Sequence, residues 1–329
     1  MAKNSNGKKR HLLYDIFHRD QYSGKGVSKN DTLPRNFRNF FKLCWWHMGT
    51  IVSVNLIFII GNFPLLFGLL GISGIFNGTL PSPTSSIFSS LYATMQEGAN
   101  PISAAMYGIH GVQGVMSVTT TPTLVMYAIA ALTFLTWGFT NVGTTYILRN
   151  LVKGEPVFVR HDFFYAIKRN LRQGFIMGLI DAILCVVMAY SVMFNYVNMV
   201  AGTIGALMFY ASALIAVIYF IMRYYMYTLL ITFDLSIWKV IKNSFIFSAL
   251  GLKRNLLATI GIAIVVVLDW YFLKVLAPLG LILPIIVLYG LCAYMGSYCS
   301  WPKIKQYMVD PYETDEAPTE EPIFSDDVV

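Results

Sequence analysis

Six long apolar stretches dominate the hydrophobic pattern of the chain. Each contains about 20 or more mostly apolar residues, the length that an α-helix needs to cross a bilayer core. The stretches are residues 43–72, 124–148, 174–199, 203–231, 255–274 and 276–298. The last two are separated by a turn around Ala277-Pro278, so they could instead form one tight hairpin that does not cross fully. The pattern predicts an all-α polytopic membrane protein with about six transmembrane helices in three hairpins.

The connection between the first two spans, residues 73–123, also carries a helical pattern. Apolar positions at helical spacing cover about 87–95 and 102–109, within a segment rich in Ser, Thr, Gly and Pro. They predict two short amphipathic helices on the membrane surface. These helices either cap the ends of the spans or form a lid or a docking surface for an extracellular partner.

An amphipathic helix is also expected between the fourth and fifth spans. Asp234 stands where an N-cap is expected, and Gly251 is placed to end the helix. Lys242 flanks an apolar stripe and Asn243 follows it. The stripe consists of Leu235, Trp238, Ile241 and Phe245. The pattern predicts an interfacial helix whose lysines meet the anionic headgroups of the lipid bilayer, or a solvated helix that only links two spans.

The composition excludes most soluble classes of protein. Of 329 residues, 56% are apolar and 12% are charged, and the mean hydropathy is +0.58. Soluble globular chains carry about 25% charged residues. A cytosolic enzyme, a disordered chain and a secreted disulfide scaffold are therefore excluded. The four cysteines form no C-x-x-C pair, so they are expected to be packing residues.

The distribution of Lys and Arg predicts the orientation in the membrane. Residues 1–42 carry ten, 149–172 carry six and 232–254 carry four, whereas 73–123 and 200–202 carry none. Basic connections stay in the cytoplasm. We therefore expect both termini in the cytoplasm and residues 73–123 outside.

Three parts of the chain are expected. Residues 1–42 form a basic cytoplasmic tail, and residues 43–301 form the six-span membrane domain with the extracellular insert 73–123. Residues 302–329 form an acidic tail, because eight Asp and Glu lie in the last 20 residues. Low hydrophobicity and high charge predict that this tail is disordered and cytoplasmic.

A short repeat supports the hairpin arrangement. Lys168-Arg169-Asn170-Leu171 recurs 85 residues later as Lys253-Arg254-Asn255-Leu256, each time leading into a span. The same offset pairs Gly174 and Gly178 with Thr259 and Ala263. Small residues four apart let membrane helices approach closely.

Two charged residues lie near the middle of the predicted spans. Asp181 and Arg223 each fall about eight residues from the inner end of their span, or about 12 Å at 1.5 Å per residue. A lone charge at that depth costs at least about 2.5–3.5 kcal/mol. We therefore predict that they pair, with Asn141 nearby. The pair either fixes helix packing or belongs to a polar layer that lines a binding cavity, with Tyr224, Tyr225 and Tyr227 as walls.

No recognised catalytic or metal-binding motif accompanies these residues. The sequence shows no Walker loop, no H-E-x-x-H and no nucleophile elbow, and its five histidines lack the spacing of metal ligands. Glu155, His161 and Asp162 could be acid–base groups, but a solvated loop explains them more simply. We expect no catalytic residue, metal, cofactor or nucleic-acid partner.

The basic connection carries a specific likeness. The segment Thr140–Tyr146 leads into Leu151-Val152-Lys153-Gly154-Glu155, and Asp162-Phe163-Phe164, Ile167-Lys168 and Asn170 follow. Together with Asn55–Pro64 and with Phe233-Asp234-Leu235-Ser236 through Lys242-Asn243, these motifs resemble the bacterial YesL-like membrane family. The likeness covers about 36–66 and 137–300.

This resemblance implies a multi-pass protein of the bacterial cytoplasmic membrane whose biochemical activity is uncharacterised. Family members tend to accompany carbohydrate uptake. The expected function is therefore a non-enzymatic accessory or scaffold protein beside a sugar ABC transporter permease. The alternative is a transporter of a small solute. The motif residues that would carry the family's function on the cytoplasmic side are Lys153, Gly154, Glu155, Phe163, Phe164, Lys168, Asn170, Asp234, Lys242 and Asn243.

Overall fold

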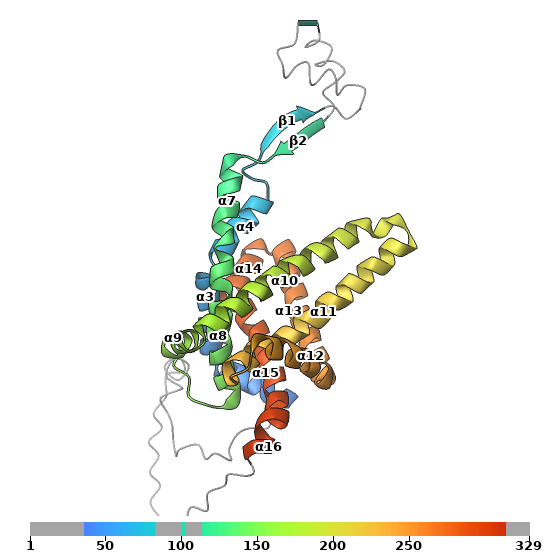
Figure 1. Cartoon of the computed structure of the whole chain (residues 1–329). Helices are drawn as coiled ribbons and strands as arrows, with labels where there is room; N and C mark the ends of the chain where they lie inside the picture. The colour runs from blue at the N-terminus through green and yellow to red at the C-terminus, as the bar shows by residue number, and fades with distance from the viewer. Residues whose placement is uncertain (1–35, 83–100, 103–113, 314–329) are drawn as a thin grey trace, which may run out of the picture.

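The computed structural model describes residues 36–82, 101–102 and 114–313, and nearly all of its regular structure is helical (Figure 1). Within these residues, five helical segments are long and apolar enough to cross a membrane, or six if a bent pair of helices near the N-terminus is one span. The chain is thus an all-α, multi-pass membrane protein, as predicted.

The first predicted span is divided into three helices. These are α2 (Phe37–Trp46), α3 (Met48–Gly61) and α4 (Pro64–Ile72), and α2 bends by 74° from α3. The predicted span, residues 43–72, therefore contains a sharp bend at His47, and residues 43–46 belong to α2. This helix buries only Leu43 and Cys44. Its exposed aromatic residues are typical of a helix that lies at the membrane surface.

Two strands lie between α4 and the next long helix in the chain. Strand β1 (Gly78–Ser82) pairs antiparallel with β2 (Gly114–Val118), with Gly78 opposite Val118. Thr123 at the start of the next helix donates a 2.9 Å hydrogen bond to Asn77, which fixes the base of this ribbon. The strands were not predicted, because Gly and Pro disfavour strands. The two predicted surface helices lie outside the described residues, apart from 101–102.

The next three spans agree with the prediction. The second is α7 (Thr121–Ala131) continued by α8 (Thr133–Lys153); the third is α10 (Leu171–Val197) and the fourth is α11 (Thr203–Thr232). The short helix α9 (Val159–Arg169) precedes α10, and the 3₁₀ turn η4 (Asn198–Ala201) joins α10 to α11.

The predicted interfacial helix is α12 (Ile237–Leu250). Gly251 is its C-cap, as expected, but Ser236 and not Asp234 is its N-cap. The chain leaves α11 in an extended conformation at Phe233, which delays the start of α12 by two residues. Trp238 is 74% exposed and lies beside the exposed Lys239, so the helix presents an aromatic and basic face outward.

The last two predicted spans are two helical segments, each long and apolar enough to cross a membrane. Helix α13 (Leu252–Val275) is about 36 Å long. A second helical segment then returns as α14 (Ala277–Leu283), the π-helical η5 (Pro284–Leu288), α15 (Tyr289–Ile304), the π-helical η6 (Lys305–Val309) and α16 (Asp310–Glu313).

The predicted disorder from residue 302 is wrong for residues 302–313. Pro302 lies inside α15, and the helix continues because its neighbours Trp301 and Ile304 are buried. Contacts with the bundle thus hold this part of the acidic tail in place. The rest of that tail, like residues 1–35, lies outside the described residues.

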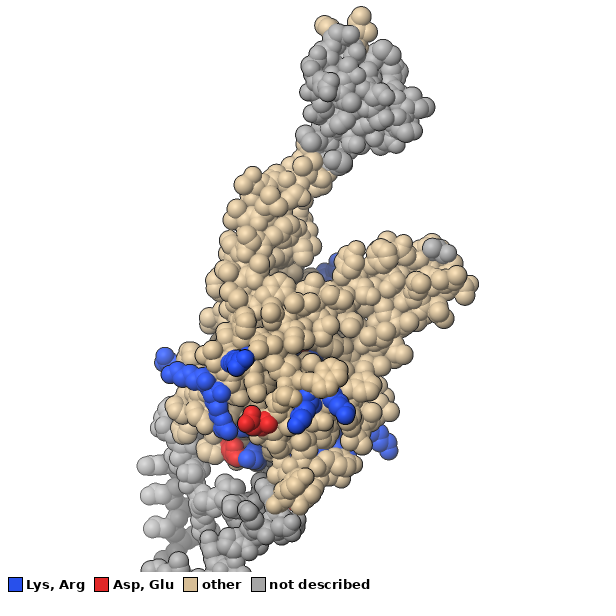
Figure 2. All heavy atoms as spheres, in the orientation of Figure 1, with Lys and Arg blue, Asp and Glu red and all other residues tan. Residues whose placement is uncertain are grey.

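Figure 1 shows how the helices are arranged. Helices α4 and α7 pack side by side and form a column that carries the strand ribbon. Helices α10 and α11 project away from the column as a pair. We call their outer part, residues 183–218, the arm. On the face shown in Figure 2, almost all Lys and Arg gather at the end opposite the ribbon.

Close packing joins α8 to α10. A β-carbon added at Gly138 would collide with the backbone of Gly174 and Gly178, and one added at Gly178 would collide with Gly138. Gly174 and Gly178 are the small residues that the sequence repeat singled out. Their predicted role in close helix approach is confirmed.

Buried asparagine side chains form hydrogen bonds with backbone groups where helices are interrupted. Asn55 on α3 donates to the carbonyl oxygens of Pro284 and Ile285, at 3.0 and 2.6 Å, and accepts from the amide of Gly290 at 3.0 Å. In a membrane, water cannot satisfy backbone groups freed at such a break. Asn55 therefore stabilises the π-helical segment and joins it to the first span.

The repeated asparagines have corresponding roles. Asn170 donates to the carbonyl oxygen of Ala166 near the end of α9, at 2.9 Å. Asn255 donates to those of Phe247 and Ser248 near the end of α12, at 3.3 and 2.9 Å. In both copies, the asparagine satisfies carbonyl groups of the short helix that precedes a span.

Candidate functional site

A buried carboxylate lies where α8, α10 and α11 meet. Asp181 is fully buried and forms an ion pair with Arg223, whose Nε donates to Oδ1 at 2.8 Å and whose Nη2 donates to Oδ2 at 3.1 Å. The predicted pair is thus confirmed, and its bidentate geometry is the strong form of this contact.

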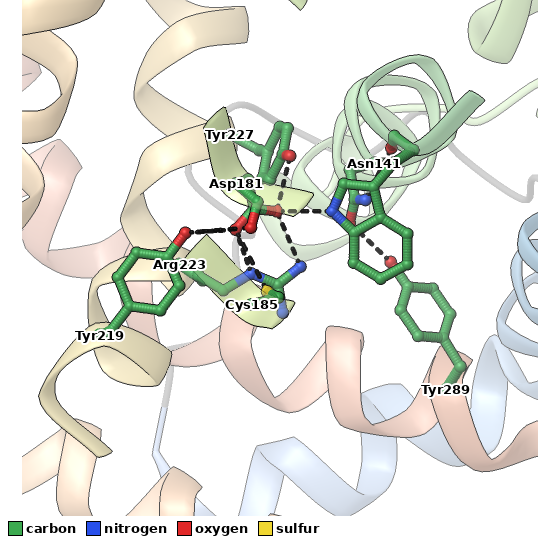
Figure 3. Close-up of polar contacts among 8 residues, drawn as sticks. Asn141, Asp181, Cys185, Tyr219, Arg223, Tyr227 and Tyr289 are labelled. Atoms are coloured by element: carbon green, nitrogen blue, oxygen red, sulfur yellow. Dashed lines mark hydrogen bonds and ion pairs between the residues drawn. The ribbon is translucent and has the colours of Figure 1, made fainter. Parts of the chain in front are cut away.

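Uncharged donors complete the surroundings of Asp181 (Figure 3). The hydroxyl of Tyr219 donates to Oδ1 at 2.7 Å, and the hydroxyl of Tyr227 donates to Oδ2 at 2.8 Å. The indole Nε1 of Trp137 donates to Oδ2 at 2.8 Å. The thiol of Cys185 lies 3.7 Å from Oδ1. We call Asp181, Arg223 and these four residues the Asp181 cluster.

Helical spacing brings the partners of Asp181 together. Tyr219, Arg223 and Tyr227 follow one another at intervals of four, so they share one face of α11. Cys185 follows Asp181 by four residues on α10. Trp137 comes from α8, which the glycine contacts hold close to α10. Tyr227 was expected near Arg223, whereas Trp137, Cys185 and Tyr219 were not. For Tyr219, the four-residue spacing from Arg223 was a signal.

Asn141 lies beside the cluster but does not contact Asp181. Its amide donates to the carbonyl oxygen of Trp137 at 2.8 Å, and its oxygen accepts from the hydroxyl of Tyr289 at 3.2 Å (Figure 3). It is therefore connected to the pair through Trp137, as expected for a residue at the same depth.

Two of the three predicted tyrosine walls face elsewhere. The hydroxyl of Tyr224 is 3.1 Å from that of Thr259 on α13, and Tyr225 donates to Asn255 at 2.6 Å. They join α11 to α13 and do not surround Arg223. The expectation that Tyr224 and Tyr225 line the polar layer is wrong, because helix rotation turns them toward α13.

The carboxylate of Asp181 already accepts as many hydrogen bonds as it can. A carboxylate offers about four lone-pair sites, and Asp181 already receives two bonds from Arg223 and three from uncharged donors. No surface of Asp181 is left for a substrate. The cluster is therefore suited to holding three helices together. The side chain of Arg223 is 20% exposed, so it is less enclosed than that of Asp181.

The motif residues after α8 form a helix end. Gly154 is the C-cap of α8 with a φ of 87°, a left-handed conformation that favours glycine. Its amide and that of Glu155 donate to the carbonyl oxygen of Asn150, both at 3.0 Å. Lys153 and Glu155 form an exposed ion pair at 2.5 Å. This motif ends the helix and turns the chain toward α9.

The motif residues of α9 are divided between packing and exposure. The ring of Phe163 fills the space beside Gly143 on α8, whereas Phe164 is 57% exposed. Asp162 accepts from the amide of Phe158 at 2.9 Å and so stabilises the start of α9. Lys168 is exposed. The structure thus spreads these residues along a surface helix and does not gather them into one site.

The motif residues near α12 stand apart from that group. Asp234 is exposed in the link between α11 and α12, Lys242 is exposed on α12 and Asn243 is half-buried beside it. Within residues 36–82, 101–102 and 114–313, no group of three His, Cys, Asp or Glu could hold a metal ion.

Comparisons of the chain with known protein families, with curated proteins and with solved structures find no match.

Proposed function

We propose that this chain is a non-enzymatic accessory protein of a bacterial cytoplasmic membrane, which presents a helical arm to a partner membrane protein. The resemblance of its motifs to the YesL-like family supports the permease of a sugar ABC transporter as that partner. The distribution of Lys and Arg supports a topology with both termini in the cytoplasm.

The observation that carries this proposal is the contrast between the two ends of α10 and α11. In the part of the pair that packs against α8, Met177 and Asp181 on α10 and Tyr227 on α11 are buried. In the arm, Tyr190 and Met193 are each 70% exposed and Leu207 is 69% exposed. Figure 1 shows the arm standing away from the column of α4 and α7. Its apolar surface is available to the helices of another membrane protein.

The closed Asp181 cluster gives the arm a fixed base. Because the carboxylate ties α11 to α10 and α8, the direction of the arm is set by side chains that are buried, apart from the half-buried Trp137. A docking element with a fixed direction loses less conformational entropy on binding than a flexible one.

Co-purification from native membranes tests the proposal. The parent chain should recover a sugar permease in stoichiometric amount. Substituting Val187→Trp and Leu214→Trp, which adds bulk to the arm, should abolish recovery. The matched control is Leu124→Trp with Val125→Trp on α7, where exposure is similar. Equal recovery with the arm variant, or no permease with the parent chain, would refute the proposed role.

Transport of a small solute is the second candidate function. One observation favours it: the Nη1 of Arg223 donates to none of the described residues, and this cation lies in the middle of a span. The purified chain alone, reconstituted in liposomes, distinguishes the two. The accessory role predicts no sugar uptake by the chain without its partner, whereas uptake would favour transport.

A further inference from the structure

A cavity of about 370 Å³ lies where α10 begins and α11 ends. Its walls are residues 169–173 and 230–234, and none of them belongs to the Asp181 cluster. The volume is in the range of sites that bind small molecules, about 300–1,000 Å³. The cavity therefore offers a second place where a ligand could bind.

The wall formed by residues 169–173 is positive. It contains the exposed residues Arg169 and Arg172, and the Nη1 of Arg169 also donates to the hydroxyl of Tyr165 at 3.4 Å. It also contains the first turn of α10, whose N-cap Asn170 makes no side-chain capping bond. The backbone amides at a helix start add partial positive charge. Two arginines and free amides together suit a phosphate group.

The wall formed by residues 230–234 carries hydrogen-bond acceptors, and we call it the acceptor wall. It carries the exposed carboxylate of Asp234 and the last carbonyl groups of α11, where the helix dipole is negative. These are acceptors, and they suit a positively charged group that can donate hydrogen bonds. The cavity thus has one wall that carries cations and another that carries acceptors.

Arg149 on α8 holds the acceptor wall in place, and its guanidinium offsets part of the negative charge there. Its Nη1 donates to the carbonyl oxygen of Ile231 at 3.3 Å and to the hydroxyl of Thr232 at 3.1 Å. Its Nε and Nη2 donate to Asn150, at 3.2 and 2.8 Å. Because Arg149 is buried and engaged in these bonds, it positions the wall without filling the cavity.

The position of the cavity along the spans indicates what surrounds it in a membrane. The apolar span of α10 begins at Leu171 and that of α11 ends at Thr232, and both residues line the cavity. Spans end where the hydrocarbon core gives way to the headgroups. Leu171 is 56% exposed, so an apolar surface adjoins the polar walls. A molecule that is polar at one end and apolar at the other fits this place.

We infer that the cavity binds the headgroup of an aminophospholipid, of the phosphatidylethanolamine class. The phosphodiester lies against Arg169, Arg172 and the first amides of α10. The ammonium group lies against Asp234 and the last carbonyls of α11, and the acyl chains follow the apolar surface beside Leu171. Phosphatidylcholine lacks ammonium hydrogens, and phosphatidylglycerol lacks the positive charge, so neither satisfies both walls.

Native mass spectrometry of the purified, delipidated full chain tests this inference. With equal amounts of the three lipids, the parent chain should retain phosphatidylethanolamine in preference to the other two. Arg169→Gln with Arg172→Gln should weaken its binding by about tenfold or more, because the substitutions remove two charged hydrogen-bond donors from the phosphodiester. Asp234→Asn should remove the preference over phosphatidylglycerol while leaving phosphodiester binding. Lys239→Gln with Lys242→Gln, on α12 outside the cavity, is the matched control and should change neither.

Three results would overturn the inference. One is phosphatidylethanolamine binding that the double arginine variant does not weaken beyond the lysine control. Another is equal retention of phosphatidylglycerol by the parent chain, which would refute the ammonium site. The third is soluble glycerophosphoethanolamine binding as tightly as the lipid, which would show that the cavity recognises a solute. Asp234→Asn keeps the test decisive if the double arginine variant does not fold.

Discussion

One carboxylate joins three helices in this protein. Asp181 on α10 receives donors from Trp137 on α8 and from Tyr219, Arg223 and Tyr227 on α11. In a low-dielectric interior, an ionised acceptor gains most when all its lone pairs are used. The cluster therefore converts a costly buried charge into a specific contact between helices.

Removing one uncharged donor should destabilise the protein measurably. Tyr227→Phe should lower the free energy of unfolding by about 1.5–3 kcal/mol, because it deletes a hydrogen bond to a charged group. Thermal unfolding in detergent measures this effect. Tyr190→Phe, on an exposed tyrosine of the arm, is the control. Equal melting temperatures of the two variants would show that the hydroxyl of Tyr227 does not stabilise the cluster.

Exchanging the two charges should not restore stability. Asp181→Ala should cost about 3–5 kcal/mol by leaving a buried charge without its partner. The double variant Asp181→Arg with Arg223→Asp recreates a pair, yet it points the donors of Trp137, Tyr219 and Tyr227 at a guanidinium group. We expect it to melt no higher than Asp181→Ala. Recovery to the melting temperature of the parent chain would mean that only the ion pair matters.

Some residues of the Asp181 cluster could be predicted from the sequence, and others could not. Asp181 and Arg223 were found because charges at mid-membrane depth need partners. Tyr219 could have been found, because it lies four residues before Arg223. Trp137 could not, because apolar spans leave helix rotation undetermined, and rotation decides which side chains face inward.

Close approach between α8 and α10 determines where the cluster forms. Gly138 and Gly178 bring the two backbones into contact, and Trp137 lies next to Gly138 in α8. A larger side chain at either glycine would separate the helices and move the indole away from Asp181.

Gly178→Ala should therefore destabilise the protein strongly, by about 1–3 kcal/mol or more, because its β-carbon collides with the backbone of Gly138. Gly49→Ala on α3 is the matched control, because nothing lies within 4 Å of its β-carbon. Thermal unfolding compares them. A melting temperature for Gly178→Ala as high as that of the control would show that the helices are free to separate.

The hydrophobic pattern predicts the spans well, but it does not predict bends or the ends of helices. Long apolar stretches define spans well, because crossing a bilayer requires about 20 apolar residues. The bend at His47 was not predicted, because α2 is aromatic enough to extend the apolar stretch. Residues 302–313 were expected to be disordered from their charge and proline content. They are helical because Trp301 and Ile304 pack into the bundle.

The molecule as a whole separates charge from apolar surface. Figure 2 shows Lys and Arg at the end that carries α9 and α12, and the arm and column are almost free of them on this face. Helix α11 is about 45 Å long, and a bilayer core is about 30 Å thick. The helix is therefore longer than the core is thick, and a tilt, which accommodates such an excess, agrees with an arm that leaves the column.

Cysteine labelling on intact cells should establish the topology. In a parent chain without its four native cysteines, Thr79→Cys in β1 should react with an impermeant thiol reagent. Ser236→Cys, before α12, should react only after the cells are opened. Both positions are exposed, so burial does not explain a difference. The opposite labelling pattern would place the basic end outside and contradict the proposed orientation.

Site-specific photocrosslinking in native membranes tests the accessory role most directly. A photoreactive residue at Val187 or Leu214 on the arm should form one discrete adduct with a sugar permease. The same residue at Leu124 on the column, which is similarly exposed, should crosslink to lipid alone. If the arm positions also capture only lipid while the chain is correctly inserted, the arm has no protein partner and the proposed function is wrong.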